Sequence, residues 1–100
     1  MTVPIDVETA TLLAATFKGL GDSTRLRLLS ILLKGETCVS DLAEKTSISQ
    51  SAVSHQLRIL RNLGFVSTRR DGKNIFYAID DNHIEGLYTL AIEHIDHLDK

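Results

Sequence analysis

The sequence predicts a mainly α fold of the α+β class, with five helices and one β-hairpin. Three observations lead to this prediction. The chain of 100 residues is 43% apolar and contains one proline, so it suits a single domain with one modest core. Apolar residues recur at a helical period along most of its length. Between residues 65 and 79 the pattern changes to two short strands around an Asp-Gly pair, which favours a tight hairpin turn.

The first two helices have recognisable ends. Asp6 is an N-cap candidate for a segment whose apolar residues continue at helical spacing until Gly21, a residue type that commonly ends helices. A second helix begins near Asp22 or Ser23 and ends at Gly35. Its leucines form a stripe at the helical period, so one side of this helix is expected to be buried.

Two shorter helices and a turn follow. Ser40 is placed to cap a short third helix with the sequence DLAEKT, and Ser49 is placed to cap a fourth helix over about 50–63. Gly64 ends this fourth helix. Two short helices joined by a turn resemble a helix-turn-helix, in which the second helix enters the major groove of DNA. The fourth helix is therefore the predicted recognition helix.

The chain continues with the hairpin and ends with a longer helix. The strands FVSTRR and IFYAI, joined by DGKN, form a predicted wing over about 65–79, and the final helix covers about 81–98. A hairpin with basic residues around its tip completes a winged helix-turn-helix. Neither a repeat nor a linker interrupts the sequence, so residues 1–100 are predicted to form one domain.

Composition argues against several classes of protein. No apolar run approaches the roughly 18 residues that span a membrane, and the start of the chain lacks the pattern of a signal peptide. The one cysteine, Cys38, cannot form an internal disulfide, which agrees with a reducing compartment. We therefore expect a cytoplasmic protein without a membrane partner.

Charge is distributed unevenly along the chain. The charges of residues 1–39 sum to zero. Residues 40–79 carry six basic and three acidic side chains, a net charge of +3, whereas residues 80–100 carry one basic and six acidic side chains, a net charge of −5. The middle of the chain can thus face phosphate, and its end can face a cation.

The fourth helix and the hairpin carry the side chains expected to bind DNA. Short polar groups near the start of a recognition helix reach base edges, and basic groups on a hairpin contact phosphates. The predicted set is Gln50, Ser51, Ser54, His55 and Arg58 on the helix, with Arg69, Arg70 and Lys73 around the hairpin. The alternative is that these are ordinary solvated residues, since similar helix pairs occur in domains that bind only protein. The same two interpretations apply to His55 alone.

Three of the four histidines lie on the last helix. Viewed down a helix axis, His94 and His97 both fall within about 40° of His83. His83 and His94 are separated by about 16 Å along the helix, whereas zinc–nitrogen bonds are about 2.0 to 2.1 Å long, so one chain cannot close a site. Two copies packed antiparallel would bring Asp81 and His83 of one chain to the two later histidines of the other, at two symmetric sites.

These residues suit a homodimer that binds zinc. The histidines can lie at the margin of a dimer contact, because they flank a face of the last helix that carries apolar residues. These apolar residues are Ile84, Leu87, Ala91, Ile95 and Leu98. The first helix offers Leu12, Leu13 and Phe17 to the same contact. One aspartate with three histidines suits tetrahedral Zn(II), for which Co(II) should substitute. The alternative is that an acidic, histidine-bearing terminal helix is solvated surface.

Three features of the sequence carry a family resemblance. They are the stretch FKGLGDSTRLRLLSILL, the stretch SQSAVSHQLRIL in the recognition segment, and the pattern Asp-x-His, ten residues, His-x-x-His at the end. Over nearly its whole length the chain resembles the ArsR/SmtB family of metal-sensing transcriptional repressors, most closely its zinc-sensing CzrA-like branch. The resemblance implies that the zinc ligands are Asp81, His83, His94 and His97. It also implies a metal-free homodimer that binds operator DNA with an inverted repeat. Zinc would release that DNA, so that genes for metal efflux or sequestration are expressed.

One departure from the family pattern concerns Cys38. Several members bind cadmium, lead or arsenic through Cys-Val-Cys-Asp-Leu, whereas this chain has Ser40 in place of the second cysteine. Cys38 is thus expected to be a small buried or half-buried thiol rather than a ligand. By the same resemblance, the Gly64 carbonyl is a candidate partner for the second ring nitrogen of His94 or His97. That contact would link the metal to the recognition helix.

Two other functions fit parts of the sequence less well. An enzyme is not expected, because four protein ligands leave zinc no open position for water, and no positioned base or nucleophile is evident. A metal-independent winged-helix module that binds DNA or protein is the main alternative, and it would bind no zinc. In the predicted mechanism, zinc instead fixes a dimer whose recognition helices do not match successive major grooves, about 34 Å apart.

Overall fold

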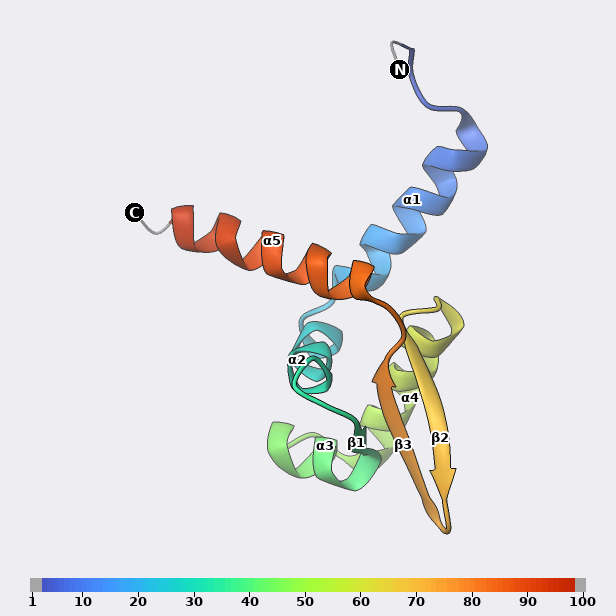
Figure 1. The fold of residues 1–100 in the computed structure, drawn as a ribbon, viewed down its shortest axis with the longest axis vertical. Helices are drawn as coiled ribbons and strands as arrows, with labels where there is room; N and C mark the ends of the chain where they lie inside the picture. The colour runs from blue at the N-terminus through green and yellow to red at the C-terminus, as the bar shows by residue number, and fades with distance from the viewer. Residues whose placement is uncertain (1–2, 99–100) are drawn as a thin grey trace.

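The computed structural model describes residues 3–98, so the predicted domain 1–100 extends two residues beyond it at each end. Within this range Figure 1 shows five helices and a small sheet. The helices are α1 (Val7–Leu20), α2 (Ser23–Leu32), α3 (Val39–Thr46), α4 (Gln50–Asn62) and α5 (Asn82–Leu98). The strands are β1 (Thr37–Cys38), β2 (Val66–Asp71) and β3 (Asn74–Ile79). The prediction of a mainly α fold with five helices and a β-hairpin wing is confirmed.

Most of the predicted helix caps are present in the structure. Asp6, Asp22 and Ser49 each accept a hydrogen bond from the backbone N–H three residues later, at 2.7, 3.0 and 3.2 Å. The prediction that Ser40 caps α3 is wrong. This helix begins at Val39, so Ser40 lies inside its first turn.

A short additional strand explains the earlier start of α3. Thr37 pairs with Tyr77 and Cys38 with Phe76, so β1 extends the hairpin to a three-stranded antiparallel sheet in the order β1-β3-β2. The pairing holds the chain extended up to Cys38, and α3 begins at the next residue. Two residues are too few to show the alternation that predicts a strand.

Strands β2 and β3 form the predicted wing. They pair antiparallel from Val66 opposite Ile79 to Asp71 opposite Asn74. Gly72 in the turn has a φ of +63°, a backbone conformation that glycine adopts without strain. The Asp-Gly pair therefore closes the hairpin as the sequence indicates.

The core lies among α2, α3, α4 and the sheet. Its largest fully buried side chains are Leu28, Leu29, Leu42, Val53, Leu57 and Leu60. Burial of one such side chain contributes about 1.5–3 kcal/mol. These contacts hold α4 against α2 and α3, and they fix which side of α4 faces outward. We call α2, α3, α4 and the three strands the head.

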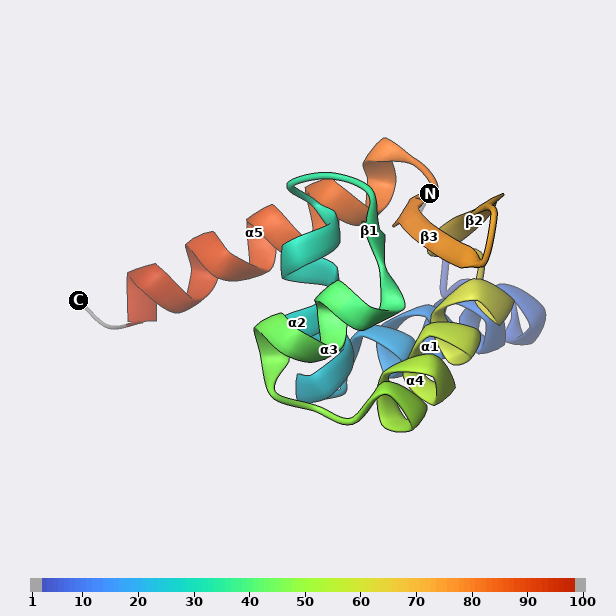
Figure 2. The ribbon, with the colours of Figure 1, turned by 90° about the horizontal axis from the view of Figure 1, so that it is seen from below.

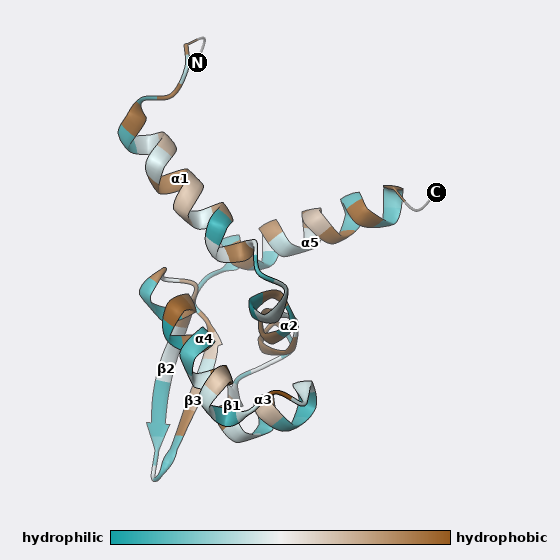
Figure 3. Ribbon diagram, turned by 180° about the vertical axis from the view of Figure 1, so that it is seen from behind, coloured by the Kyte–Doolittle hydropathy of each residue, from teal (hydrophilic) through white to brown (hydrophobic). Residues whose placement is uncertain are grey.

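Helices α1 and α5 leave the head in different directions, and we call them the arms (Figures 1 and 2). Figure 3 shows apolar segments along both arms in brown. Their exposed large apolar side chains are Val7, Leu12, Leu13 and Phe17 on α1 and Leu90, Ile92, Ile95 and Leu98 on α5. Although apolar, neither arm nor any other helix in residues 3–98 has the length and hydropathy of a membrane span.

The C-terminal end of α1 packs closely against the head. Gly19 lies so near Leu63 and Phe65 that a Cβ atom at this position would collide with the Leu63 side chain. A glycine therefore lets the end of α1 pass over the end of α4 and the residue before β2.

Candidate DNA interface and metal-ligating residues

The outer face of α4 carries the side chains predicted to read bases. Val53, Leu57 and Leu60 are completely buried because they recur at helical spacing on the side that faces the head. Of the predicted residues on α4, Ser54 is half-buried and the others are exposed. The exposed ones are Gln50, Ser51, His55 and Arg58. The structure thus presents short polar and basic groups on one helix that can enter a major groove.

The wing contains three predicted phosphate-binding cations, and the structure distinguishes Arg69 from the other two. Arg69 Nε donates to Glu36 Oε2 at 3.0 Å, and Arg69 Nη2 donates to Glu36 Oε1 at 2.6 Å. The guanidinium also lies 4.8 Å from the centre of the Phe76 ring, and its Nη1 is 3.8 Å from Asp71 Oδ2. The hydrogen bonds between the two side chains lower the pKa of Glu36 and raise the pKa of Arg69. Arg69 therefore joins the wing to the segment before β1, and its charge already has an acidic partner.

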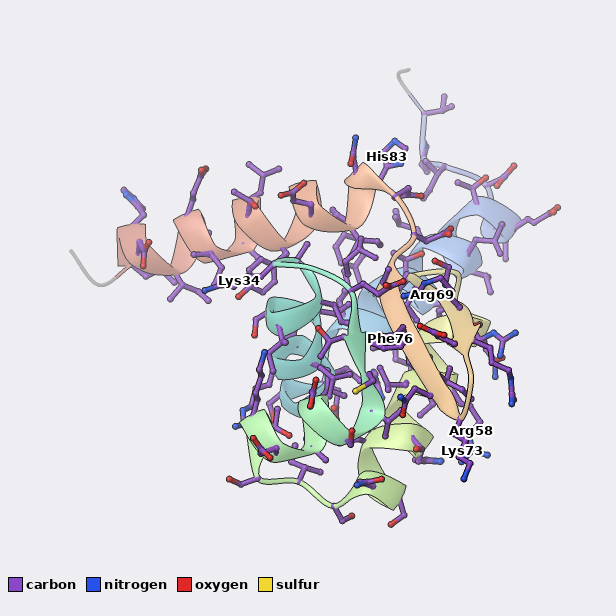
Figure 4. All side chains as sticks on the ribbon, turned by 60° about the horizontal axis from the view of Figure 1, so that its bottom comes forward. Lys34, Arg58, Arg69, Lys73, Phe76 and His83 are labelled. Carbon is purple, nitrogen blue, oxygen red and sulfur yellow. The ribbon has the colours of Figure 1, made fainter. Side chains whose placement is uncertain are left out.

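Arg70 and Lys73 are exposed, and neither forms an ion pair with any residue that the structure describes. Figure 4 shows Lys73 and Arg58 on the same side of the molecule, away from His83. These positions suit contact with the phosphates that flank a groove. No local pattern in the sequence links Glu36 to Arg69, because the two residues are 33 positions apart.

The predicted metal ligands lie at the two ends of α5. Asp81 precedes the helix, and its Oδ1 accepts a hydrogen bond from the His83 backbone N–H at 2.9 Å and lies 3.4 Å from His83 Nδ1. The His83 side chain is 92% exposed. His94 and His97 are exposed in the last turns. In residues 3–98 no three side chains of the metal-ligating types come close enough to one another to hold an ion.

Gly64 follows α4 with a φ of +79°, and its N–H donates to the Arg61 carbonyl at 3.0 Å. The last turns of α5 lie on a different side of the molecule (Figure 1). Within one chain, the structure therefore does not bring His94 or His97 to the Gly64 carbonyl.

An apolar hollow of about 420 Å³ lies between α1, α2 and α5. Its apolar lining includes Phe17, Leu20, Leu26, Leu87, Ala91, Ile92 and Ile95. Four of the residues predicted for a dimer contact are therefore in this lining, namely Phe17 on α1 and Leu87, Ala91 and Ile95 on α5. Ile84, predicted for the same contact, is 5% exposed and packs into the core of its own chain.

Cys38 is buried, as the sequence predicts. Its Sγ lies 3.3 Å from Ser40 Oγ. A hydroxyl therefore stands beside the thiol, two residues along the chain.

Helices α3 and α4 pack into the head, α4 exposes a polar face, and a hairpin with basic side chains follows it. This arrangement defines the class of winged helix-turn-helix DNA-binding proteins. Comparison with known proteins gives the family. The model described as "Bacterial regulatory protein, arsR family" matches residues 22–68, from the start of the head into β2. With the relatives below, this match shows that the chain belongs to the ArsR/SmtB family of transcriptional regulators.

Two sequence relatives and one solved structure illustrate the similarity. A transcriptional repressor SmtB homolog of Synechocystis is 44% identical over 95% of this chain and 72% of its own length. The HTH-type transcriptional regulator NmtR of Mycobacterium tuberculosis is 45% identical over 95% of this chain and 79% of its own length. The homodimeric winged helix-turn-helix DNA-binding domain Mb0332 of Mycobacterium bovis, a possible ArsR-family regulator, has a TM-score of 0.82 at 28% identity, covering 96% of this chain and 91% of that one.

These comparisons confirm part of the functional prediction. The relatives are transcriptional regulators and not enzymes, as the sequence analysis expects. They carry the names of different family members, so they support the family and not the zinc-sensing CzrA-like branch in particular.

Proposed function

We propose that this chain is a metal-responsive repressor. A homodimer binds operator DNA in its metal-free form and releases it when zinc binds between the two α5 helices. The observation that carries the proposal is the arrangement of donors on this arm. Asp81 with His83, and His94 with His97, are exposed at opposite ends of one protruding helix. Each pair is half of a tetrahedral site.

A second copy of the chain is the partner that fits the arms. Exposed apolar side chains lie along both of them, such as Phe17 on α1 and Ile95 on α5, which are 56% and 52% exposed. Both of these residues line the hollow of about 420 Å³. Large uncovered apolar surfaces on a soluble chain mark interaction sites. A twofold contact between identical arms covers both copies at once, and the related domain Mb0332 is a homodimer.

An antiparallel pair of α5 helices would join the half-sites. The eleven residues from His83 to His94 span about 16 Å of helix, too far for one ion with bonds of about 2.0 to 2.1 Å. In a twofold pair, the first turn of one α5 faces the last turns of the other. Each ion then takes Asp81 and His83 from one chain and two histidines from the partner, and two equivalent sites result.

The donor set favours zinc over thiophilic ions. One carboxylate and three imidazoles suit a tetrahedral zinc ion, and cobalt(II) should substitute for it. Asp81 Oδ1 lies 3.4 Å from His83 Nδ1, so two donors of a half-site are already close together. The only thiol of the sequence, on Cys38, is buried beside Ser40, so the chain has no pair of thiolates to offer.

DNA release follows from coupling between the arms and the head. In the metal-free dimer, the two α4 helices can take the separation of successive major grooves, about 34 Å. Ions bound by both chains would restrict the arms to one arrangement and the heads to one separation. A coupling free energy of about 1–3 kcal/mol changes operator affinity about 5- to 150-fold, and DNA then weakens zinc binding by the same factor. A contact from His94 or His97 to the Gly64 carbonyl would have to form in the dimer.

One pair of variants tests this assignment. His94→Asn removes a predicted ligand, so it should bind an inverted-repeat duplex like the wild type and fail to release it on zinc addition. The duplex is selected by the wild-type protein from a random-sequence library, and release is followed by fluorescence anisotropy. His55→Asn is the matched control, since it removes a histidine from α4 and should keep about one tight zinc ion per chain in equilibrium dialysis.

Two results would contradict the proposal. A His94→Asn protein that still releases DNA when zinc is added would exclude this residue from the site. A wild-type dimer that binds DNA but no zinc would support the metal-independent winged-helix module instead.

A further inference from the structure

Arg25 makes hydrogen bonds to two other helices. It lies in the first turn of α2. Its Nε donates to the Gly19 carbonyl at 2.7 Å, and its Nη2 donates to the Lys18 carbonyl at 3.2 Å, both at the end of α1. Its Nη1 donates to Oε1 of Gln56, in the middle of α4, at 3.0 Å. One guanidinium thus joins an arm to the recognition helix.

Each of these contacts has a physical basis. The last carbonyls of a helix have no partner within it and carry a partial negative charge, so a cation stabilises the end of α1. The guanidinium is planar and presents its donors in fixed directions, which suits several acceptors at once. Arg25 is half-buried, so its bonds are screened less by solvent than those of an exposed side chain.

A second contact also holds the end of α1 against α4. Gly19 packs against Leu63 and Phe65, beyond the last turn of α4. Gln56 and Leu63 are seven residues apart, a distance of about 10 Å along a helix. Both attachments are made at the last turn of α1, at Lys18 and Gly19, so together they hold the end of α1 at one place along α4.

We propose that Arg25 is a positioning residue that ties α4 to α1 through Gln56 and so sets the separation of the two recognition helices in the dimer. The inference rests on the proposed function, because it takes α1 to be part of the dimer contact. Gln56 follows His55 on the recognition helix, but it is half-buried and its Oε1 is occupied by Arg25. Its role is therefore to hold the helix and not to read a base.

The spacing of operator half-sites provides the readout. The wild-type protein selects an inverted-repeat duplex from a random-sequence library, and a second duplex is made with one extra base pair between the half-sites. The extra pair moves one half-site by about 3.4 Å along the DNA axis. The affinities of the metal-free protein for the two duplexes are measured by fluorescence anisotropy, and their ratio is compared among variants.

Gln56→Met has a similar length and no acceptor, and it leaves Arg25 on the end of α1. It should weaken binding to the selected duplex about 2- to 10-fold for each chain of the dimer, as expected for one lost hydrogen bond. Binding to the lengthened duplex should be unchanged, so the ratio falls. Gln56→Glu keeps an acceptor for the guanidinium and should keep the ratio. Arg25→Met should lower the ratio as well, and the double variant should lower it no further than the larger single effect.

Arg27→Met is the matched control. Arg27 lies on the same helix, and its Nη2 donates to the Thr46 carbonyl at the end of α3 at 3.2 Å. It therefore closes a helix end without joining α1 to α4, and its loss should leave the ratio unchanged. Sedimentation velocity and thermal unfolding verify that each variant compared is a folded dimer.

The outcomes separate this inference from the proposed function. A Gln56→Met protein that keeps the wild-type ratio, even with equally weakened binding to both duplexes, overturns the inference alone. A wild-type protein that selects no inverted repeat overturns the proposed function, and the inference with it.

Discussion

The head and the arms differ in where their apolar side chains are buried. In the head, Leu57 and Leu60 are completely buried by residues of the same chain. On the arms, Phe17 is 56% exposed and Leu90 is 66% exposed. The head is thus stabilised within one chain, whereas the arms keep apolar surface that their own chain does not cover. Two parts of the molecule therefore suit two roles. The head carries the predicted recognition helix α4, and the arm α5 carries the donors of the proposed metal site.

The largest expected effect is a loss of stability in the head. Leu57→Ala removes a completely buried side chain and leaves a cavity, so it should lower the free energy of unfolding by about 2–5 kcal/mol. Leu90→Ala, at a position of α5 that is 66% exposed and lies outside the predicted dimer contact and the hollow, should change it by less than about 0.5 kcal/mol. Guanidinium denaturation at one fixed protein concentration measures both. Similar losses at the two positions would remove the distinction between head and arm.

The next effect concerns association through the arms. Ile95→Glu places a charge in the apolar hollow between α1, α2 and α5, so it should raise the dimer dissociation constant at least about 30-fold while the head stays folded. Sedimentation velocity measures the association, and circular dichroism monitors the fold. Glu93→Ala, an exposed position on the same helix outside that hollow, is the control and should leave the dimer intact. An Ile95→Glu protein that dimerises like the wild type would show that this surface is not the contact.

A smaller effect distinguishes two neighbouring arginines of the wing. Arg70 has no ion-pair partner among residues 3–98, so Arg70→Ala should reduce the slope of log affinity against log salt by about 0.9 for each chain. Arg69→Met should change the slope less, because Glu36 already balances that charge. Anisotropy titrations over a range of salt concentrations provide the slopes. Equal changes for the two variants would mean that Arg69 exchanges Glu36 for phosphate on binding.

The smallest effect is the contribution of Glu36 to stability in acid. The hydrogen bond from Arg69 lowers the pKa of this carboxyl below its ordinary value of 4.5. The ionised form therefore stabilises the folded state above about pH 4.5, and this contribution is lost as the pH falls through the folded-state pKa. Glu36→Gln should melt slightly below the wild type near neutral pH, and the difference should shrink in acid. A difference in melting temperature that does not change between about pH 3 and pH 7 would contradict the assignment.

The sequence predicts those parts of the fold that depend on neighbouring residues. Asp6, Asp22 and Ser49 each cap a helix by accepting a hydrogen bond from the backbone N–H three residues later. Gly72 closes the turn of the wing. Strand β1 is different, because it exists only through pairing with β3, far along the chain. The prediction that Ser40 caps α3 is wrong for the same reason, because the pairing of β1 with β3 precedes a helix that begins at Val39.

The candidate DNA-binding and metal-ligating residues can likewise be predicted only where local sequence determines their exposure. Helical periodicity is enough to place Gln50, Ser51, His55 and Arg58 of α4 and the histidines of α5 at the surface. It does not reveal that Arg25 and Arg69 donate hydrogen bonds to other side chains, because their acceptors Gln56 and Glu36 are 31 and 33 residues away. It also does not separate Ile84, which is buried in its own chain, from Ile95, which remains 52% exposed. Such distinctions depend on the tertiary fold.

The most direct test of the account is an anisotropy titration of a labelled inverted-repeat duplex, selected as above, with metal-free protein, then zinc, then a chelator. The account predicts that anisotropy rises with protein, falls when zinc weakens the affinity about 5- to 150-fold, and recovers when the chelator removes the ion. An affinity for the duplex that is the same with and without zinc would contradict it.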